Sequence, residues 1–254
     1  MSGHSKWATT KHRKAAQDAK RSALFSKLTR VITVAAREGG DPNPDNNAAL
    51  AAAIAKAKGY SLPKDKIDLA IKKAFSNGGD SANFESVTYE GNGPCGVKFY
   101  LEALTDNRNR TAADVRSAFT HSGGELLTSG SVAFLFQRRG QITLDKTVCE
   151  DEDELMMAVA EAGGDDYEDA DEEWVVWTQP GDLMPVKKGL EEQGLEVKGA
   201  ELVMQPNTPK VIDNAADARK VLRLVDKLED LDDLQSVYHN MEMTDEVAEE
   251  VEND

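Results

Sequence analysis

The fold is decided by residues 141–205, which read QITLDKTVCEDEDELMMAVAEAGGDDYEDADEEWVVWTQPGDLMPVKKGLEEQGLEVKGAELVMQ. The run QITL predicts a strand, and apolar residues then recur at helical spacing over Glu152–Ala162, before a Gly-Gly pair that ends the helix. After an acidic turn, WVVWT predicts a second apolar strand, which is followed by a helix over about 180–193 and the strand EVKGAELVMQ. Together these elements predict the βαββαβ order of a ferredoxin-like domain over residues 139–206.

The segments on either side of this domain predict a second α+β domain. Residues 81–138 contain a strand, a Gly/Pro turn, a longer strand, a helix with Thr111 as its N-cap, and the strongly apolar run Ser131–Phe136, read as a strand. After the first domain come a helix over Ala215–Asp230 and the strand LQSVYH. We expect 81–138 and 207–245 to join into a second ferredoxin-like sandwich, into which the first is inserted.

Residues 1–80 predict a basic arm and a helical bundle. The first dozen or so residues lack apolar periodicity, so we expect a mobile arm there and a helix from about Ala15, with a buried stripe through Leu28. The breaks GGDPNPDNN and SLPKD separate this helix from two more. The predicted fold class is therefore α+β: an N-terminal helical bundle followed by two ferredoxin-like α+β domains, one inserted in the other.

Positive charge is concentrated at the N-terminus of an acidic chain. The formal net charge is −16, yet residues 1–75 hold 15 Lys and Arg against 6 Asp and Glu, and the remaining residues hold 15 against 40. The acidic body repels a polyanion and the first 75 residues attract one, so any nucleic acid binds at the basic end. The alternative is a solubilising basic segment that folds onto the acidic body.

Sequence patterns of enzymatic sites are lacking. The four histidines have no metal-ligand spacing, and no G-x-S-x-G, H-E-x-x-H or P-loop pattern occurs. The acidic clusters 150–154 and 165–173 do not match the ligand spacing of an EF-hand, which favours solvated faces over a cation site. We therefore expect no catalysis, no cofactor, no metal and no small-molecule substrate.

The sequence favours a cytoplasmic protein without membrane contact. Its two cysteines form no C-x-x-C motif and suit a reducing compartment. No apolar run of about 18 residues predicts a membrane span, and no apolar segment follows the basic N-terminus as it would in a secretory signal.

The basic segment offers side chains suited to phosphate. Lysine ammonium groups and arginine guanidinium forks bind phosphate oxygens. Trp7 lies among them and either stacks on a base or anchors the arm to the bundle. The N-terminal candidates for nucleic-acid binding are Lys6, Trp7, Lys11, His12, Arg13, Lys14, Lys20, Arg21, Lys27 and Arg30.

The stretch TDNRNRT (Thr105–Thr111) is the second candidate site. It places Arg108 and Arg110 between a strand and a helix, near the free backbone N–H groups of the helix start, where a phosphate can bind. The alternative is an ion-paired loop, because Asp106 can pair with one of the arginines.

Four stretches give the chain a close resemblance to the YebC/PmpR family. They are GHSKWATTKHRKAAQDAKRSALFSKLTR (Gly3–Arg30), YEGNGP, LTDNRNRTAADVR and GSVAFLF, and the resemblance extends to VYHN near the C-terminus. The chain departs from the family at Asn92, where an aromatic residue is common, which puts in doubt a stacking role at that position.

The resemblance implies a three-domain cytoplasmic or mitochondrial protein with a non-enzymatic role facing nucleic acid. The family is usually described as probable transcriptional regulators that bind DNA. Other members, including a mitochondrial translational activator, are linked to the ribosome and to translation of difficult stretches such as proline runs. DNA and ribosomal RNA thus both stay open as partners.

The nature of the contact also stays open. The sequence predicts no helix-turn-helix with a clear recognition helix, so structured RNA or DNA-backbone contacts fit at least as well as major-groove reading. A further alternative is a protein-interaction module without direct nucleic-acid contact.

Overall fold

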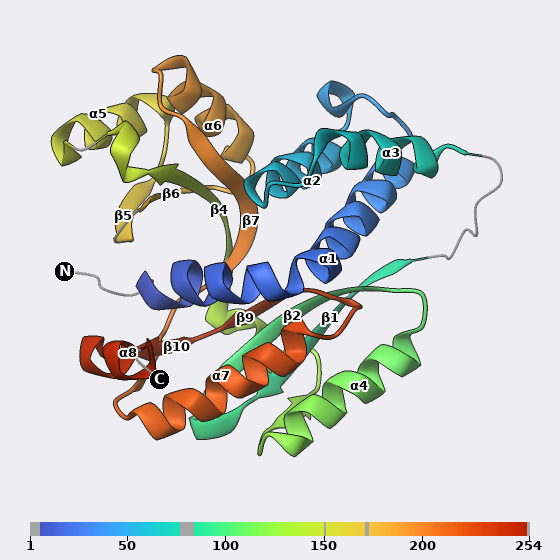
Figure 1. The fold of residues 1–254 in the computed structure, drawn as a ribbon, viewed down its shortest axis with the longest axis vertical. Helices are drawn as coiled ribbons and strands as arrows, with labels where there is room; N and C mark the ends of the chain where they lie inside the picture. Colours follow the sequence, from blue (N-terminus) through green and yellow to red (C-terminus); the bar gives the residue numbers. More distant parts are fainter. Residues whose placement is uncertain (1–5, 77–83, 150, 171–172, 253–254) are drawn as a thin grey trace. The chain divides into compact units, whose positions relative to one another are not determined.

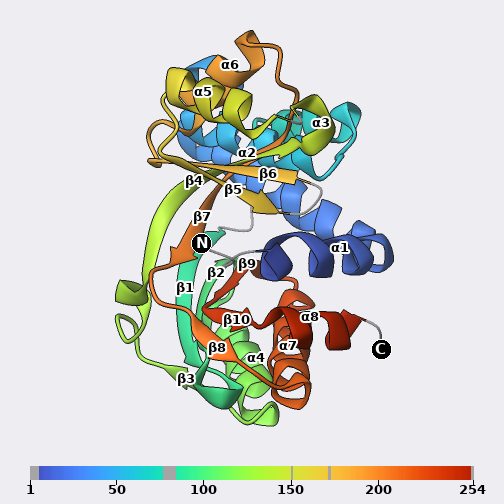
Figure 2. The same cartoon turned by 90° about the vertical axis from the view of Figure 1, so that its left-hand side faces the viewer.

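The computed structural model describes residues 6–76, 84–149, 151–170 and 173–252, and of residues 6–20 and 252 it describes the backbone alone. The chain divides into two compact units, which Figures 1 and 2 show from two directions. The first unit comprises residues 1–16, 81–137 and 204–254, and the second comprises residues 17–80 and 138–203. The fold is α+β, with a helical N-terminus followed by sheet domains, as the sequence predicts.

The N-terminal region contains three helices, α1 (Lys6–Gly39), α2 (Ala48–Gly59) and α3 (Lys64–Ala74). They share one apolar core, in which Leu28, Ile32, Leu50 and Ile67 are buried. The expectation that this helix starts only at about Ala15 is wrong for the described residues, since α1 begins at Lys6. Residues 6–15 are mostly good helix formers and include no Gly or Pro, so they can form a helix although they lack the apolar periodicity by which a helix is recognised in a sequence.

Asn47 fixes the connection between α1 and α2. Its buried side chain accepts a hydrogen bond from the backbone N–H of Leu50 as the N-cap of α2, and donates to the carbonyl of Ala35 in α1 at 2.9 Å. A Cβ on Gly39 would lie 2.1 Å from the Asn47 amide nitrogen, so only glycine fits there. The linker GGDPNPDNN is therefore a defined joint between the two helices.

Residues 136–206 form the predicted ferredoxin-like arrangement. The elements are β4 (Phe136–Asp145), α5 (Glu152–Ala162), β5 (Asp166–Ala170), β6 (Glu173–Thr178), α6 (Leu183–Glu192) and β7 (Val197–Pro206). The sheet order is β5-β6-β4-β7, and β6 runs antiparallel to both β5 and β4. Ile142, Trp174 and Val176 pack against Leu155 of α5 and Leu190 of α6 in a second core.

The first unit contains a four-stranded sheet with helices on one face. Its main elements are β1 (Glu85–Asn92), β2 (Lys98–Thr105), α4 (Arg108–His121), β3 (Glu125–Leu127), α7 (Ala215–Glu229) and β9 (Leu234–His239). The sheet order is β3-β1-β2-β9, with antiparallel neighbours throughout. Phe99 of β2 packs between Phe119 of α4 and Leu224 of α7, so both helices cover the same face.

The remaining elements of this unit follow β7 or end the chain. Strand β8 (Lys210–Ile212) pairs in parallel with β10 (Met241–Met243), and α8 (Asp245–Glu252) packs on α7 through Val247. The element order is β-β-α-β before residues 138–203 and α-β after them, which makes this unit a two-layer sandwich with a different order from the ferredoxin-like one.

The predicted strand Ser131–Phe136 is wrong. A short 3-10 helix, η3 (Ala133–Leu135), occupies this run, and β4 begins only at Phe136. The carboxylate of Glu90, in β1, accepts the backbone N–H groups of Val132 and Ala133, which a sheet ladder would need.

The predicted N-cap of α4 is also wrong. Asn107 caps this helix by accepting the N–H of Arg110, so Thr111 lies one turn inside the helix, where it is buried. The cap is set by the first side chain that reaches an N–H group of the opening turn, and Asn107 precedes Thr111 along the chain.

Candidate nucleic-acid interface

The basic residues of the N-terminus lie on one continuous helix. Helix α1 has 34 residues, which corresponds to about 50 Å of length. A seven-residue repeat returns to nearly the same side of an α-helix, with a drift of about 20° per repeat. Two rows of basic positions follow this repeat: Lys6, Arg13, Lys20 and Lys27 in one row, and Lys14 and Arg21 in a second row about 100° further round the helix. We call these six positions the basic line.

Most of the predicted N-terminal site residues are placed by their backbone only. Their side chains lie outside the described residues; the set is Lys6, Trp7, Lys11, His12, Arg13, Lys14 and Lys20. The choice between base stacking and anchoring for Trp7 therefore stays a prediction. Helical geometry alone sets the positions of the basic line along α1.

The described half of the helix contains the other three candidates. Arg21 is exposed, and its guanidinium carbon lies 5.4 Å from the centre of the Phe25 ring. Lys27 and Arg30 are half-buried, and each interacts with another part of the chain. Of these three, Arg21 is therefore the most open to a phosphate.

Lys66 is a neighbouring cation that reasoning from the sequence missed. It lies in α3, and its ammonium nitrogen is 5.1 Å from the centre of the same Phe25 ring. Both cations thus lie near the same aromatic ring, whose π-electrons favour positive charge. The charge count of residues 1–75 includes Lys66, but only the fold brings α3 beside Phe25.

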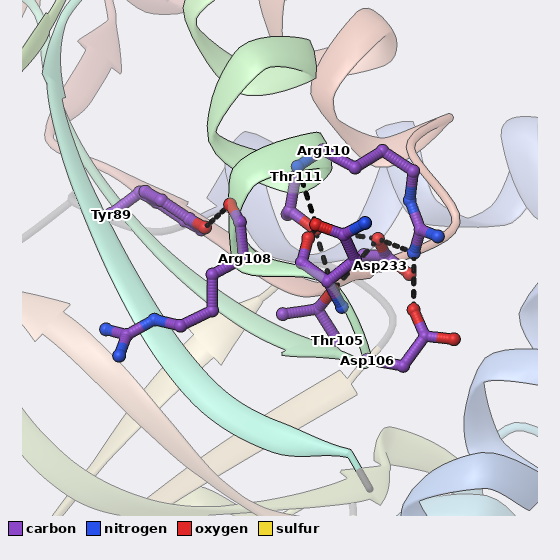
Figure 3. A network of polar contacts seen from close by, with 8 residues as sticks. Tyr89, Thr105, Asp106, Arg108, Arg110, Thr111 and Asp233 are labelled. Atoms are coloured by element: carbon purple, nitrogen blue, oxygen red, sulfur yellow. Dashed lines mark hydrogen bonds and ion pairs between the residues drawn. The ribbon is translucent and has the colours of Figure 1, made fainter. Parts of the chain in front are cut away.

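Arg110 of the second candidate site is held in a polar network inside the first unit (Figure 3). Its guanidinium donates to Asp233 at 2.7 Å and to Asp106 at 2.8 Å. The hydroxyl of Thr111 also donates to Asp233, at 2.7 Å, and the hydroxyl of Thr105 lies 3.3 Å from the same oxygen. The network ties the start of α4 to the turn between α7 and β9.

Asp233 is the centre of this network. Burial raises the pKa of its carboxyl, but the hydrogen bonds from Arg110 and Thr111 outweigh burial and hold the pKa below its ordinary value. The buried carboxylate is thus charged and satisfied by donors from β2 and α4. Arg110 has a structural role here, which supports the ion-paired alternative for this residue.

Arg108 differs from Arg110. Its side chain is 63% exposed and is 3.6 Å from the carboxylate of Glu85, an exposed and therefore weak ion pair. Its backbone carbonyl accepts a hydrogen bond from the Tyr89 hydroxyl at 3.3 Å (Figure 3). Of the two arginines, Arg108 is the more exposed, at 63% against 48%, and the less firmly held, so it is the better candidate for contact with an external anion.

The part of the chain that the structure describes has neither a metal-binding cluster nor a membrane-spanning helix. Among those residues, no three His, Cys, Asp or Glu side chains are arranged to hold a metal ion. Across the same residues, no helix has the length and apolar character needed to cross a membrane.

Comparisons with known proteins place the chain in a family. Residues 5–77 match the model of the TACO1/YebC protein N-terminal domain, and residues 84–241 match the model of the TACO1/YebC second and third domain. A probable transcriptional regulatory protein of Rubrobacter xylanophilus is 50% identical over 252 residues, covering 99% of both chains. One from Nocardia farcinica is 47% identical over the full length of both.

A solved structure is also similar to this chain. The crystal structure of a conserved hypothetical protein from Aquifex aeolicus matches with a TM-score of 0.83 and 41% identity, covering 95% of this chain and 98% of that one. The family models together cover most of the chain, and the relatives match it from end to end. The chain belongs to the TACO1/YebC family.

Proposed function

We propose that the protein is a non-enzymatic, nucleic-acid-binding regulator of gene expression, which contacts the phosphate backbone through the basic line of α1. The observation that carries the proposal is the continuous 34-residue helix with basic residues at seven-residue intervals, in a chain whose remaining residues are strongly acidic. Such a helix can follow successive phosphates along one strand or groove, because its basic positions recur along its length within less than half of its circumference.

The names of the relatives support a regulatory role. The Rubrobacter and Nocardia proteins are both named probable transcriptional regulatory proteins. On this basis we propose duplex DNA as the first partner to test, in the cytoplasm. The same basic line also fits the backbone of structured RNA, so ribosomal RNA is the second partner to test.

Affinity is expected to fall steeply as salt is raised. If the basic line neutralises about four phosphates, affinity for duplex DNA falls about 100-fold between about 50 and 200 mM salt, because each neutralised phosphate releases condensed counterions. Gel-shift titrations of the full chain with generic duplex DNA and with a ribosomal RNA fragment measure this slope. An affinity independent of salt, or no binding to either at low salt, contradicts the proposal.

A further inference from the structure

The chain segment 130–136 is fixed on the sheet of the first unit by a buried carboxylate. Glu90, in β1, is only 2% exposed. Its two carboxylate oxygens accept backbone N–H groups from Gly130 at 2.6 Å, Val132 at 2.5 Å and Ala133 at 3.0 Å. A carboxylate removed from water needs such donors. If the segment moved away from the sheet, Glu90 would lose its hydrogen bonds or become exposed to water, so the segment is held in place.

The same segment is also fixed on its other side. The carbonyl of Leu135 accepts the backbone N–H of Asn207 at 2.8 Å. Phe136 is buried, with its ring centre 6.0 Å from that of Tyr100 in β2. Since Tyr100 is the β-ladder partner of Glu90, both anchors lie on the same row of the sheet.

Phe134 lies between these anchors and points into solvent. Its side chain is 70% exposed, the highest value among the exposed large hydrophobic residues of the described chain. The exposed residues that flank the segment are polar, namely Thr128, Ser129, Gln137 and Asn207. A single ring on a fixed backbone, among hydroxyls and amides, differs from the apolar patch that a stable protein interface buries.

The sequence segment that carries Phe134 is free of acids. The 19 residues between Glu125 and Asp145 contain two arginines and no acid, in a part of the chain where acids outnumber bases 40 to 15. Of these arginines, Arg138 is exposed, whereas Arg139 is bound to Asp165 at 2.8 Å. The segment itself therefore presents no carboxylate to a phosphate, and the charge of Glu90, in β1, is buried and shared among three N–H groups.

We propose that Phe134 is a base-stacking residue, on which an unpaired base of a single-stranded or looped nucleic acid stacks. Aromatic rings accept any base on their face, and neighbouring hydroxyl and amide groups can contact its edges. The fixed backbone lowers the entropy lost on binding, since the ring is already presented. This inference rests on the proposed function and adds that the bound nucleic acid has unpaired bases.

The test is fluorescence anisotropy of the full chain with a labelled 20-nucleotide single strand and with the duplex of the same sequence. We expect Phe134→Ala to weaken single-strand binding about 10-fold, the usual effect of losing one stacked base, and to leave duplex binding unchanged. Phe134→Trp is expected to restore single-strand affinity. Phe75→Ala is the matched control: Phe75 is also an exposed phenylalanine and lies at the end of α3, so its loss should change neither affinity.

A second variant tests the fixed backbone with the ring kept. Glu90→Gln replaces one of the two accepting oxygens with an NH2 group that faces N–H donors, so it loosens the segment and should weaken single-strand binding with duplex binding unaltered. Circular dichroism checks that the Glu90→Gln variant is folded. If it is not folded, the Phe134 variants alone test the inference.

Each other outcome overturns the inference. If Phe134→Ala binds the single strand like the unmodified chain, or weakens both ligands equally, Phe134 does not stack on a base. If Phe134→Ala alters self-association in sedimentation and leaves nucleic-acid binding intact, the ring docks on a second copy. If the unmodified chain binds neither ligand, the proposed function fails as well, which separates the two failures.

Discussion

Reversing four charges of the basic line is expected to abolish nucleic-acid binding. The substitutions are Arg13→Glu, Lys14→Glu, Lys20→Glu and Arg21→Glu. If each lost charge-assisted contact is worth about 1 kcal/mol, affinity falls about 1000-fold at low salt, and repulsion between glutamate and phosphate adds to the loss. The salt dependence should flatten too, since about four fewer counterions are released.

The matched control reverses four charges elsewhere in the same helical region. Lys58, Lys64, Lys72 and Lys73 are exposed lysines of α2 and α3, so their replacement by glutamate changes the net charge by the same amount. We expect this control to bind within a few-fold of the unmodified chain. Equal losses in both variants would mean that overall charge, and not α1, determines binding.

The second large effect concerns stability. Asp233→Asn is expected to lower the free energy of unfolding by about 2–3 kcal/mol, because it weakens the bonds from Arg110 and Thr111 to a buried carboxylate. Urea denaturation followed by circular dichroism measures the change. Asp106→Asn is the matched control: Asp106 binds the same guanidinium but is more exposed, so its loss should cost less than about 1 kcal/mol.

The pH dependence follows from the depressed pKa of Asp233. A carboxyl whose pKa is lower in the folded state than in the unfolded state, about 3.9, stabilises the fold fully above that value. This stabilisation is lost as the pH falls from about 4 through the folded-state pKa. Asp233→Asn should therefore show a flatter loss of stability below about pH 4, and a slope equal to that of the unmodified chain would contradict the assignment.

Elements whose signals are local could be predicted from the sequence. Helix α5 has the predicted bounds Glu152–Ala162, because an apolar repeat inside it and Gly163 after it are both short-range signals. Gly163 takes the left-handed conformation that ends helices, with φ 87°. The ferredoxin-like order follows from a series of such bounded runs.

Features that depend on distant partners could not be predicted. The run SVAFLF has the composition of a strand, but Glu90, some 40 residues earlier, takes the N–H groups that pairing would need. The pairing of Arg110 could not be predicted for the same reason, since its main partner Asp233 is 123 residues away in the sequence. Neither contact leaves a trace in the local pattern, so one segment is mistaken for a strand, and the sequence alone leaves open whether Arg110 is ion-paired or binds phosphate.

The start of α1 is predicted wrongly for a third reason. Residues 6–20 have helical propensity without an apolar stripe, and periodicity detects only helices that bury one face. The helix starts at Lys6 and not at about Ala15. This extension places all six positions of the basic line on one helix.

We expect α1 to be the surface that meets nucleic acid. The most direct measurement is ultraviolet crosslinking of the full chain to bound nucleic acid, with the modified peptides identified by mass spectrometry. The account predicts crosslinks within residues 6–30, on peptides that contain the basic line. Crosslinks confined to residues 84–241, with none on α1, would contradict it.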